Sequence, residues 1–184
     1  MGKINLKLAN TNEDYLYISN LMYTESGIKE VFLGKESRVV CAYDVFIIQL
    51  DNVNIGYIYA TDEQLESFGF VDVAIVKKHR GRGYSKIAVL QLIKYYLENY
   101  PNTRFYLIGE TKKNNLPANN SVKEIGTYLF SICDRNFYLI NKEMYDDLVE
   151  TNNIELLIDH CTKGAKSACD ILRQVKEDEY KKRR

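Results

Sequence analysis

Apolar residues alternate with polar ones in some stretches of the chain and recur every three or four positions in others. In "KINLKLA" (residues 3–9) every second side chain is apolar, which predicts a strand with one buried face. Residues 85–100 carry apolar side chains at steps of three and four, and Pro101 follows, so a buried helix is predicted there. The two runs in residues 44–60 are joined by "DNVN", a signal for a hairpin.

The same patterns can be followed along the whole sequence, and they give an order of elements that defines the fold class. Strands are predicted at 3–9, 44–50, 55–60, 68–76, 104–110, 127–132 and 137–143, and helices at 10–26, 28–33, 85–100 and 116–126. After Met144 the pattern is helical to the end, with a break at Gly164. Because a hairpin precedes the central strands, we predict a mixed α/β sheet with helices on both faces, not a doubly wound parallel sheet.

The length of 184 residues suits one domain with an appendage. We assign residues 1–143 to the domain and residues 144–184 to a helical extension that packs on it. Two other roles for the extension stay open, which are a contact in a homodimer and closure of a substrate site.

Charge and cysteine content narrow the class of protein. Lys plus Arg and Asp plus Glu are 25 each, so the chain lacks the basic excess of most nucleic-acid-binding proteins. The four Cys show no spacing typical of a zinc site, so no metal is expected and the thiols suit a reducing cytosol. No apolar run approaches the roughly 18 residues of a membrane span. We therefore expect a soluble, cytoplasmic protein that binds neither membrane nor metal.

The stretch "KKHRGRGYSK" (residues 77–86) is the strongest candidate for a binding site. It lies between a predicted strand and a predicted helix, where unpaired amide groups and the helix dipole favour an anion. Gly81 and Gly83 allow positive φ, and Arg80 and Arg82 offer charged donors to phosphate. The spacing fits neither GxxxxGK[ST] nor GxGxxG, which argues against a P-loop or Rossmann site. A solvated basic turn and an RNA-binding patch are the alternatives.

The segment "IVKKHRGRGYSKIAVLQLIKYYL" resembles the central motif of the GNAT superfamily of acetyl-CoA-dependent N-acyltransferases. That motif reads Arg/Gln-x-x-Gly-x-Gly/Ala and is matched here by Arg80, Gly83 and Ser85, with Ser in place of the usual Gly or Ala. Downstream, "NLPANNSVKEIG" is similar to the Asn-x-x-Ala of the family and its following Gly, at Asn115, Ala118 and Gly126. With the order of elements, the resemblance covers about residues 3–142.

The resemblance implies a GNAT-like fold, acetyl-CoA as co-substrate, and direct transfer of acetyl to a primary amine of a small molecule or peptide. It implies that the basic loop holds the CoA diphosphate and that the end of the preceding strand pairs with the pantetheine arm. The implied cofactor-binding residues are Ile75, Val76, Arg80, Gly81, Arg82, Gly83, Tyr84, Ser85 and Asn115.

The catalytic groups are less well defined by the resemblance. Val122 stands where the family often has a Tyr that protonates the thiolate, so the acid is solvent, Ser121 or Tyr128, or is absent. Asp72 is a candidate base, because an apolar strand would raise the pKa of its carboxyl, although it equally suits a solvated face. The other titratable residues suit roles outside catalysis. Glu63 and Glu66 suit surface positions, His79 suits a solvated position, and His160 suits a structural role. A non-catalytic acyl-CoA-binding protein with the same fold is the rival function.

Overall fold

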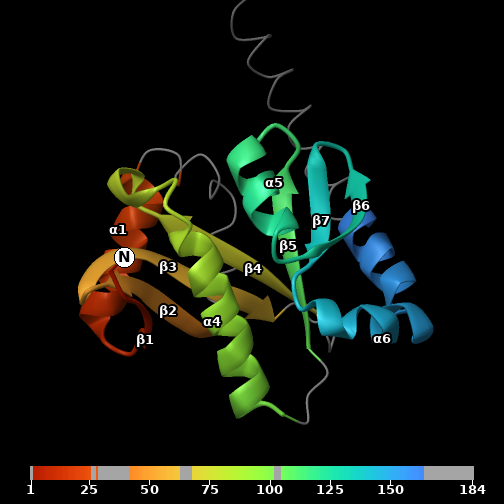
Figure 1. Cartoon of the computed structure of the whole chain (residues 1–184), viewed down its shortest axis with the longest axis horizontal. Coiled ribbons are helices and arrows are strands. Elements are labelled where there is room, and N and C mark those ends of the chain that lie inside the picture. The colour runs from red at the N-terminus through yellow and green to blue at the C-terminus, as the bar shows by residue number, and fades with distance from the viewer. Residues whose placement is uncertain (1, 26–27, 29–41, 63–67, 102–104, 164–184) are drawn as a thin grey trace, which may run out of the picture.

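The computed structural model describes residues 2–25, 28, 42–62, 68–101 and 105–163 (Figure 1). The strands are β1 (Ile4–Leu8), β2 (Ala42–Leu50), β3 (Val53–Asp62), β4 (Phe68–Ile75), β5 (Tyr106–Lys112), β6 (Thr127–Ile132) and β7 (Arg135–Leu139). The helices are α1 (Asn12–Thr24), α4 (Tyr84–Asn99), α5 (Leu116–Lys123) and α6 (Tyr145–Glu150), with 3-10 turns η1 (Lys77–His79) and η2 (Lys142–Met144). Residues 153–163 are also helical. Residues 29–33, Glu63, Glu66 and residues 164–184 of the predicted extension, all subjects of predictions above, lie outside the described residues.

The strands form one seven-stranded sheet in the order β1-β2-β3-β4-β5-β7-β6. Only the central pair, β4 and β5, is parallel, and every other neighbouring pair is antiparallel. A parallel pair requires a crossover, and α4 supplies it, whereas the antiparallel pairs β2–β3 and β6–β7 are hairpins. The predicted mixed α/β sheet is therefore confirmed.

Helices cover both faces of the sheet, and the alternation of side chains along β4 shows which face each covers. Val71 and Ile75 share a hydrophobic cluster with α4 and with Ile125, just after α5, and Figure 1 shows α4 and α5 in front of the sheet. Ala74 points to the opposite face, into a cluster with Ile18 and other residues of α1. We call these the α4 face and the α1 face. Both are buried, which explains why β2, β3 and β4 read as nearly continuous apolar runs.

The C-terminal helices cover the other half of the α1 face. Leu148, Leu157 and Cys161 are buried in a cluster with Phe70 of β4 and Tyr106 of β5, among others. The Tyr106 hydroxyl also donates a hydrogen bond to the carboxylate of Asp147 at the start of α6. The described part of the extension thus packs on the same sheet. No helix within the described ranges is both long enough and apolar enough to cross a bilayer.

Local sequence signals account for most element ends, with one instructive exception. The β2–β3 turn places Asp51 and Asn52 at φ of 49° and 67°, as a two-residue hairpin turn requires. The predicted strand at 137–143, in contrast, ends at Leu139. The buried side chain of Asn141 accepts a hydrogen bond from the Leu107 amide and donates one to the Phe105 carbonyl. Asn141 therefore holds the chain at the start of β5, and η2 replaces the last residues of the predicted strand.

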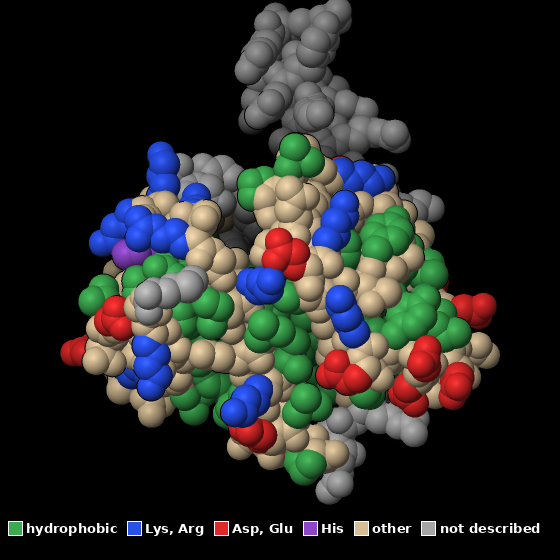
Figure 2. All heavy atoms as spheres, viewed as in Figure 1, with side chains coloured by type: hydrophobic (Ala, Val, Ile, Leu, Met, Phe, Trp, Pro, Cys, Tyr) green, Lys and Arg blue, Asp and Glu red, His purple; other side chains and the backbone are tan. Residues whose placement is uncertain are grey.

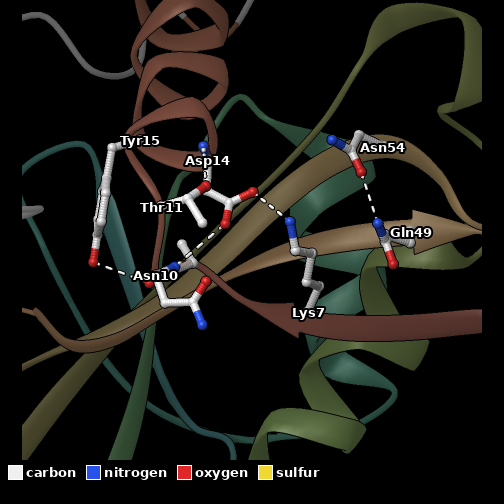
Figure 3. Close-up of polar contacts among 8 residues, drawn as sticks. Lys7, Asn10, Thr11, Asp14, Tyr15, Gln49 and Asn54 are labelled. Carbon is white, nitrogen blue, oxygen red and sulfur yellow. Dashed lines mark hydrogen bonds and ion pairs between the residues drawn. The ribbon is translucent and has the colours of Figure 1, made fainter.

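Asp14, in the first turn of α1, fastens that helix to β1 (Figure 3). Its carboxylate lies 2.6 Å from Lys7 Nζ and accepts a hydrogen bond from the Asn10 amide, while its own amide donates to the Thr11 hydroxyl that caps the helix. The hydrogen bond from Lys7 is the main reason why the pKa of Asp14 lies below its usual value of 3.8. Asp14 itself is only 4% exposed.

We expect Asp14→Asn to lower the Tm at neutral pH and to matter progressively less in acid. Because the pKa of Asp14 is lower in the folded chain than in the unfolded one, its stabilising contribution is complete above the ordinary pKa of 3.8. That contribution is lost as the pH falls through the lowered folded value. Thermal unfolding of both proteins from pH 7 down to about pH 3 measures the difference. Asp159→Asn, which removes an exposed carboxylate paired with Lys163, is the control with little effect. A difference in Tm that stays constant with pH would contradict this account.

Candidate active site

The two parallel strands in the centre of the sheet separate before they end. Their pairing runs from Phe68↔Tyr106 to Val71↔Gly109. Beyond that pair β4 continues to Ile75 and β5 continues to Lys112, with no further pairing between them. The β4 backbone from residue 72 onward therefore has no partner strand on its β5 side within the described residues. We call this divergence the fork.

A cleft of about 640 Å³ opens at the fork. Its walls come from β4, the loop after β4, the start of α4, β5 and α5. In Figure 2 the surface is hollowed between a group of Lys and Arg side chains beside a histidine and the part of the molecule that holds α5. The cleft thus joins the basic loop to the split strands.

The loop before α4 presents a run of unbonded amide groups to this cleft. Gly81 and Gly83 have φ of 74° and 76°, and a Cβ added at either would meet no atom within 4 Å. Glycine is required there by the backbone conformation and not by crowding. Within the described residues, no hydrogen-bond acceptor contacts the N–H groups from Gly81 to Lys86. Successive amides of this kind at the N-terminus of a 16-residue helix form an anion-binding concavity.

Arg80 braces the loop in addition to carrying charge. Its Nε donates a hydrogen bond of 2.7 Å to the carbonyl of Ile75, the last residue of β4. Its Nη2 lies 3.9 Å from a carboxylate oxygen of Glu25, which also accepts a 2.7 Å hydrogen bond from the Lys77 amide. Glu25 caps the end of α1, so the loop is tied to β4 and to α1. Arg82 is exposed and is not part of the cleft wall.

The backbone of Val76 was expected to pair with a pantetheine arm, but the structure engages its polar groups elsewhere. Its N–H donates to Ile55 and its carbonyl accepts from His79, so both groups are engaged inside the protein. Val76 also does not line the cleft, whereas residues 71–75 do. The unpaired edge is therefore the stretch from Asp72 to Ile75, which includes the predicted Ile75 and excludes Val76.

His79 is half-buried and lines the cleft, and is not the solvated residue that the sequence favoured. Burial lowers the pKa of its imidazole, and the positive charges of Lys78 and Arg82 add to this effect. Its buried Nδ1 has no hydrogen-bond partner in the described part of the chain. His79 consequently adds bulk to the cleft wall, and its lowered pKa disfavours the charged form of the ring.

Two carboxylates flank the fork on the α1 face. Asp72 and Glu110 each come one residue after the last parallel pair, so their side chains share a face. The Tyr59 hydroxyl donates to Asp72 at 3.1 Å, and burial together with the Asp72 charge raises the pKa of the adjacent Tyr57. Glu110 pairs with Arg135 of β7 at 2.5 Å. Asp72 was predicted from the sequence and Glu110 was not, because the partner of Glu110 is distant in the sequence.

Nothing resembling a metal site accompanies these carboxylates. Among the described residues, no group of three or more His, Cys, Asp or Glu side chains is placed to hold a metal ion.

The comparisons with known proteins bear directly on this arrangement. A family model described as the acetyltransferase (GNAT) family matches residues 14–126, which is more than half of the chain. The chain belongs to the GNAT acetyltransferase family. A search of curated proteins gave no match.

Several solved structures share the GNAT fold at low identity. The N-acetyltransferase PseH of Campylobacter jejuni, in complex with acetyl coenzyme A, is 18% identical over 74% of this chain and 96% of that one (TM-score 0.53). An acetyltransferase of Agrobacterium tumefaciens is 17% identical over 73% and 88% (TM-score 0.56). A Salmonella typhimurium enzyme that modifies the N-terminal serine of ribosomal protein L7/L12 is 12% identical over 73% and 92% (TM-score 0.53).

The second GNAT motif has a structural meaning in this chain, because it starts and stops α5. The Asn115 side chain caps the helix by accepting from the Ala118 amide at 3.3 Å. The Gly126 amide bonds to Val122, and a Cβ on Gly126 would lie 3.0 Å from the Leu139 carbonyl oxygen. Asn115 and Ala118 both line the cleft, and the cofactor contact expected of Asn115 stays a prediction.

The candidate acids lie in different parts of the structure. Ser121 and Val122 line the cleft, and Val122 also packs against the core cluster of the α4 face. Tyr128 lies on the edge strand β6, is 50% exposed, and bonds to Ser131 at 2.8 Å. It is not part of the cleft wall, because β5 and β7 stand between its strand and β4. The structure therefore does not bring Tyr128 to the fork.

Proposed function

We propose that this protein is an N-acetyltransferase that moves an acetyl group from acetyl-CoA to a primary amine by direct transfer. The single observation that carries the proposal is the continuity of the amide-lined loop with the fork through one cleft. An anion site at one end suits the CoA diphosphate, and an unpaired strand edge at the other suits the amide-bearing pantetheine arm. Solved GNAT structures with acetyl coenzyme A bound support the choice of co-substrate.

The cofactor residues of the proposal follow from the cleft. The amides from Gly81 to Lys86, including those of Arg82, Gly83, Tyr84 and Ser85, would receive the diphosphate, with Arg80 holding the loop in shape. The β4 edge from Asp72 to Ile75 would pair with pantetheine, and Asn115 would lie across the cleft from it. The thioester then lies near the fork, where the strands part.

At the fork the acceptor amine enters from the α1 face and attacks the acetyl carbonyl carbon. A new N–C bond forms, the C–S bond breaks, and the electron pair leaves with sulfur as the CoA thiolate. Asp72, oriented by Tyr59, takes the proton from the amine, and a backbone amide of β4 stabilises the oxyanion. The thiolate leaves without a dedicated acid, since a thiol of pKa about 8.5 is a fair leaving group. Of the two candidate acids named from the sequence, Ser121 is the one that lines the cleft.

The acceptor in this proposal is a small molecule or a peptide that bears a primary amine. Asp72 and Glu110 on the α1 face favour an acceptor that arrives as a cation and loses its proton at the site. Glu110 contributes attraction for the ammonium group, while its pairing with Arg135 keeps it fixed at the cleft wall.

Thermal shift followed by a thiol-release assay tests the proposal. Acetyl-CoA and CoA should both raise the Tm, in proportion to the logarithm of ligand concentration. With acetyl-CoA saturating, amines from a panel of amino acids, polyamines, aminosugars and short peptides should accelerate thiol release. A Tm that does not respond to either ligand would reject the cofactor assignment. A Tm that responds without release by any amine would favour the rival function, a non-catalytic acyl-CoA-binding protein.

We expect Gly83→Ala to weaken acetyl-CoA binding by about 10-fold, because an alanine at positive φ is strained by roughly 1–2 kcal/mol. The free loop would relax from the strained conformation and would have to return to it on binding. Isothermal titration measures the dissociation constant. Since the free loop can relax this strain and the added Cβ meets no protein atom within 4 Å, the Tm of the ligand-free variant should fall by at most about 4 °C. Unchanged affinity would separate the loop from the cofactor site.

A further inference from the structure

One ion pair joins the two helices that flank the cleft. Lys86 Nζ lies 2.6 Å from Glu124 Oε2. Lys86 is in the first turn of α4, and Glu124 is the residue that caps the end of α5. Both residues line the cleft, and α4 and α5 are in contact (Figure 1). The pair therefore spans the cleft from the amide-bearing wall to the opposite wall.

Each member of this pair opposes the dipole of its own helix. A lysine in the first turn of a helix lies near the positive end of the dipole, and a glutamate at the last turn lies near the negative end. The first turn of α4 contains no acidic residue that would offset Lys86. Neither charge is therefore placed to stabilise its own helix. The side chains are 38% and 60% exposed, so the pair adds little to the stability of the fold.

The position of Lys86 suits a bound anion better than it suits the ligand-free helix. Its own amide is the last of the unpartnered N–H groups between Gly81 and Lys86, so its side chain starts at the rim of the anion-binding loop. An anion at the loop would make the first turn of α4 a favourable place for a positive charge. In the absence of an anion, Glu124 provides the only carboxylate that the described structure pairs with Lys86.

We propose that Glu124 competes with the CoA diphosphate for Lys86, so that this ion pair sets the affinity of the cofactor cleft. In the free protein Glu124 neutralises Lys86 and links α4 to α5. On binding, Lys86 turns to the diphosphate and the link between the helices breaks. This inference rests on the proposed function, because it takes CoA as the ligand. It assigns to Glu124 a role that opposes binding of CoA. The anion-binding loop and the fork do not by themselves imply such a residue.

The competition predicts effects of opposite sign for the two partners. Lys86→Met should weaken binding of CoA by about 10-fold, since a charged contact to phosphate is lost. Glu124→Gln should tighten binding by roughly 3- to 10-fold, since Lys86 no longer has to leave a carboxylate. In the double variant the benefit of Glu124→Gln should disappear, because its effect passes through Lys86. The measurement is isothermal titration with CoA at fixed ionic strength.

Two matched controls come from the same helix. Lys94 and Glu98 of α4 form an exposed i,i+4 pair at 3.7 Å and do not line the cleft. Lys94→Met and Glu98→Gln change the net charge by the same amounts as the cleft variants and should leave CoA affinity within about 2-fold.

Ligand specificity gives a further control of a different kind. The effect of Glu124→Gln should persist with 3′-dephospho-CoA, which keeps the diphosphate, and vanish with pantetheine, which lacks it.

The outcomes of these titrations distinguish a failure of the competition from a failure of the proposed function. If the parent protein binds no CoA, the proposed function fails, and the competition fails with it. If the parent binds CoA but Glu124→Gln leaves the affinity unchanged or weakens it, only the competition is overturned. The same holds if the gain from Glu124→Gln survives in the Lys86→Met background, or if Glu98→Gln gives an equal gain. The Tm of each ligand-free variant confirms that folding is intact before the affinities are compared.

Discussion

Replacing Asp72 with Asn is expected to lower kcat for acetyl transfer by about 100- to 10,000-fold, the range typical of a lost general base. Asparagine keeps the size of the side chain and still accepts a hydrogen bond from the Tyr59 hydroxyl, but it cannot take a proton from the amine. Because Asp72 reaches the α1 face while the diphosphate loop lies elsewhere in the cleft, CoA affinity should change little. Steady-state thiol release with the best acceptor of the panel, and titration with CoA, measure the two quantities.

A closely matched control for this substitution lies on β2, which β3 separates from β4. Asp44 of β2 is held by two tyrosine hydroxyls, those of Tyr95 and Tyr100 at 3.1 and 3.2 Å, yet it does not line the cleft. Asp44→Asn should leave kcat close to that of the parent. If Asp72→Asn keeps the parent kcat, the base is another group, and Glu110→Gln becomes the variant to compare.

The parts of the site that depend on neighbouring residues could be predicted from the sequence. Two glycines between a strand and a helix predict positive φ and free amides, and both are observed at Gly81 and Gly83. The start and stop of α5 depend on Asn115 and Gly126, which act within a few residues of their own positions. The alternation of apolar residues predicted the strands, because a residue and its second neighbour share one face of a sheet.

The parts that depend on register between distant strands could not be predicted. The fork exists because β4 and β5 stop pairing after Val71↔Gly109, and no local pattern marks that point. The sequence did not mark Glu110 as a residue of the site, because its partner Arg135 is 25 residues away in the sequence and lies beside it only in the folded chain. The hypothesis that Tyr128 replaces the missing acid relied on its closeness in sequence to Val122. In the sheet order β5-β7-β6, Tyr128 lies on the edge strand, away from the fork. Sequence spacing fixes a residue on its strand, and the register between strands then determines which residues meet.

Asn119→Ala is expected to lower the free energy of unfolding by about 3–5 kcal/mol, which corresponds to a fall in Tm of about 6–20 °C for a chain of this size. Asn119 is 4% exposed and is the centre of a buried polar network. Its Oδ1 accepts hydrogen bonds from Thr111 at 2.6 Å and Tyr138 at 3.1 Å, and its Nδ2 donates to the carbonyls of Lys112 and Asn115. Alanine would remove all of these side-chain hydrogen bonds from the buried network, and the Lys112 and Asn115 carbonyls would keep only the backbone amides that also bond to them.

The adjacent residue provides the control for this prediction. Asn120 occupies the next position of α5 and is exposed, so Asn120→Ala should change the free energy of unfolding by no more than about 0.5 kcal/mol. Denaturant unfolding of both variants, with the slope checked against the parent, measures the difference. Because the network joins the end of β5 to the start of α5, Asn119→Ala should also weaken CoA binding, by loosening the wall that carries Asn115. Equal stability of the two variants would mean that water replaces the lost hydrogen bonds and that the network does not hold this wall.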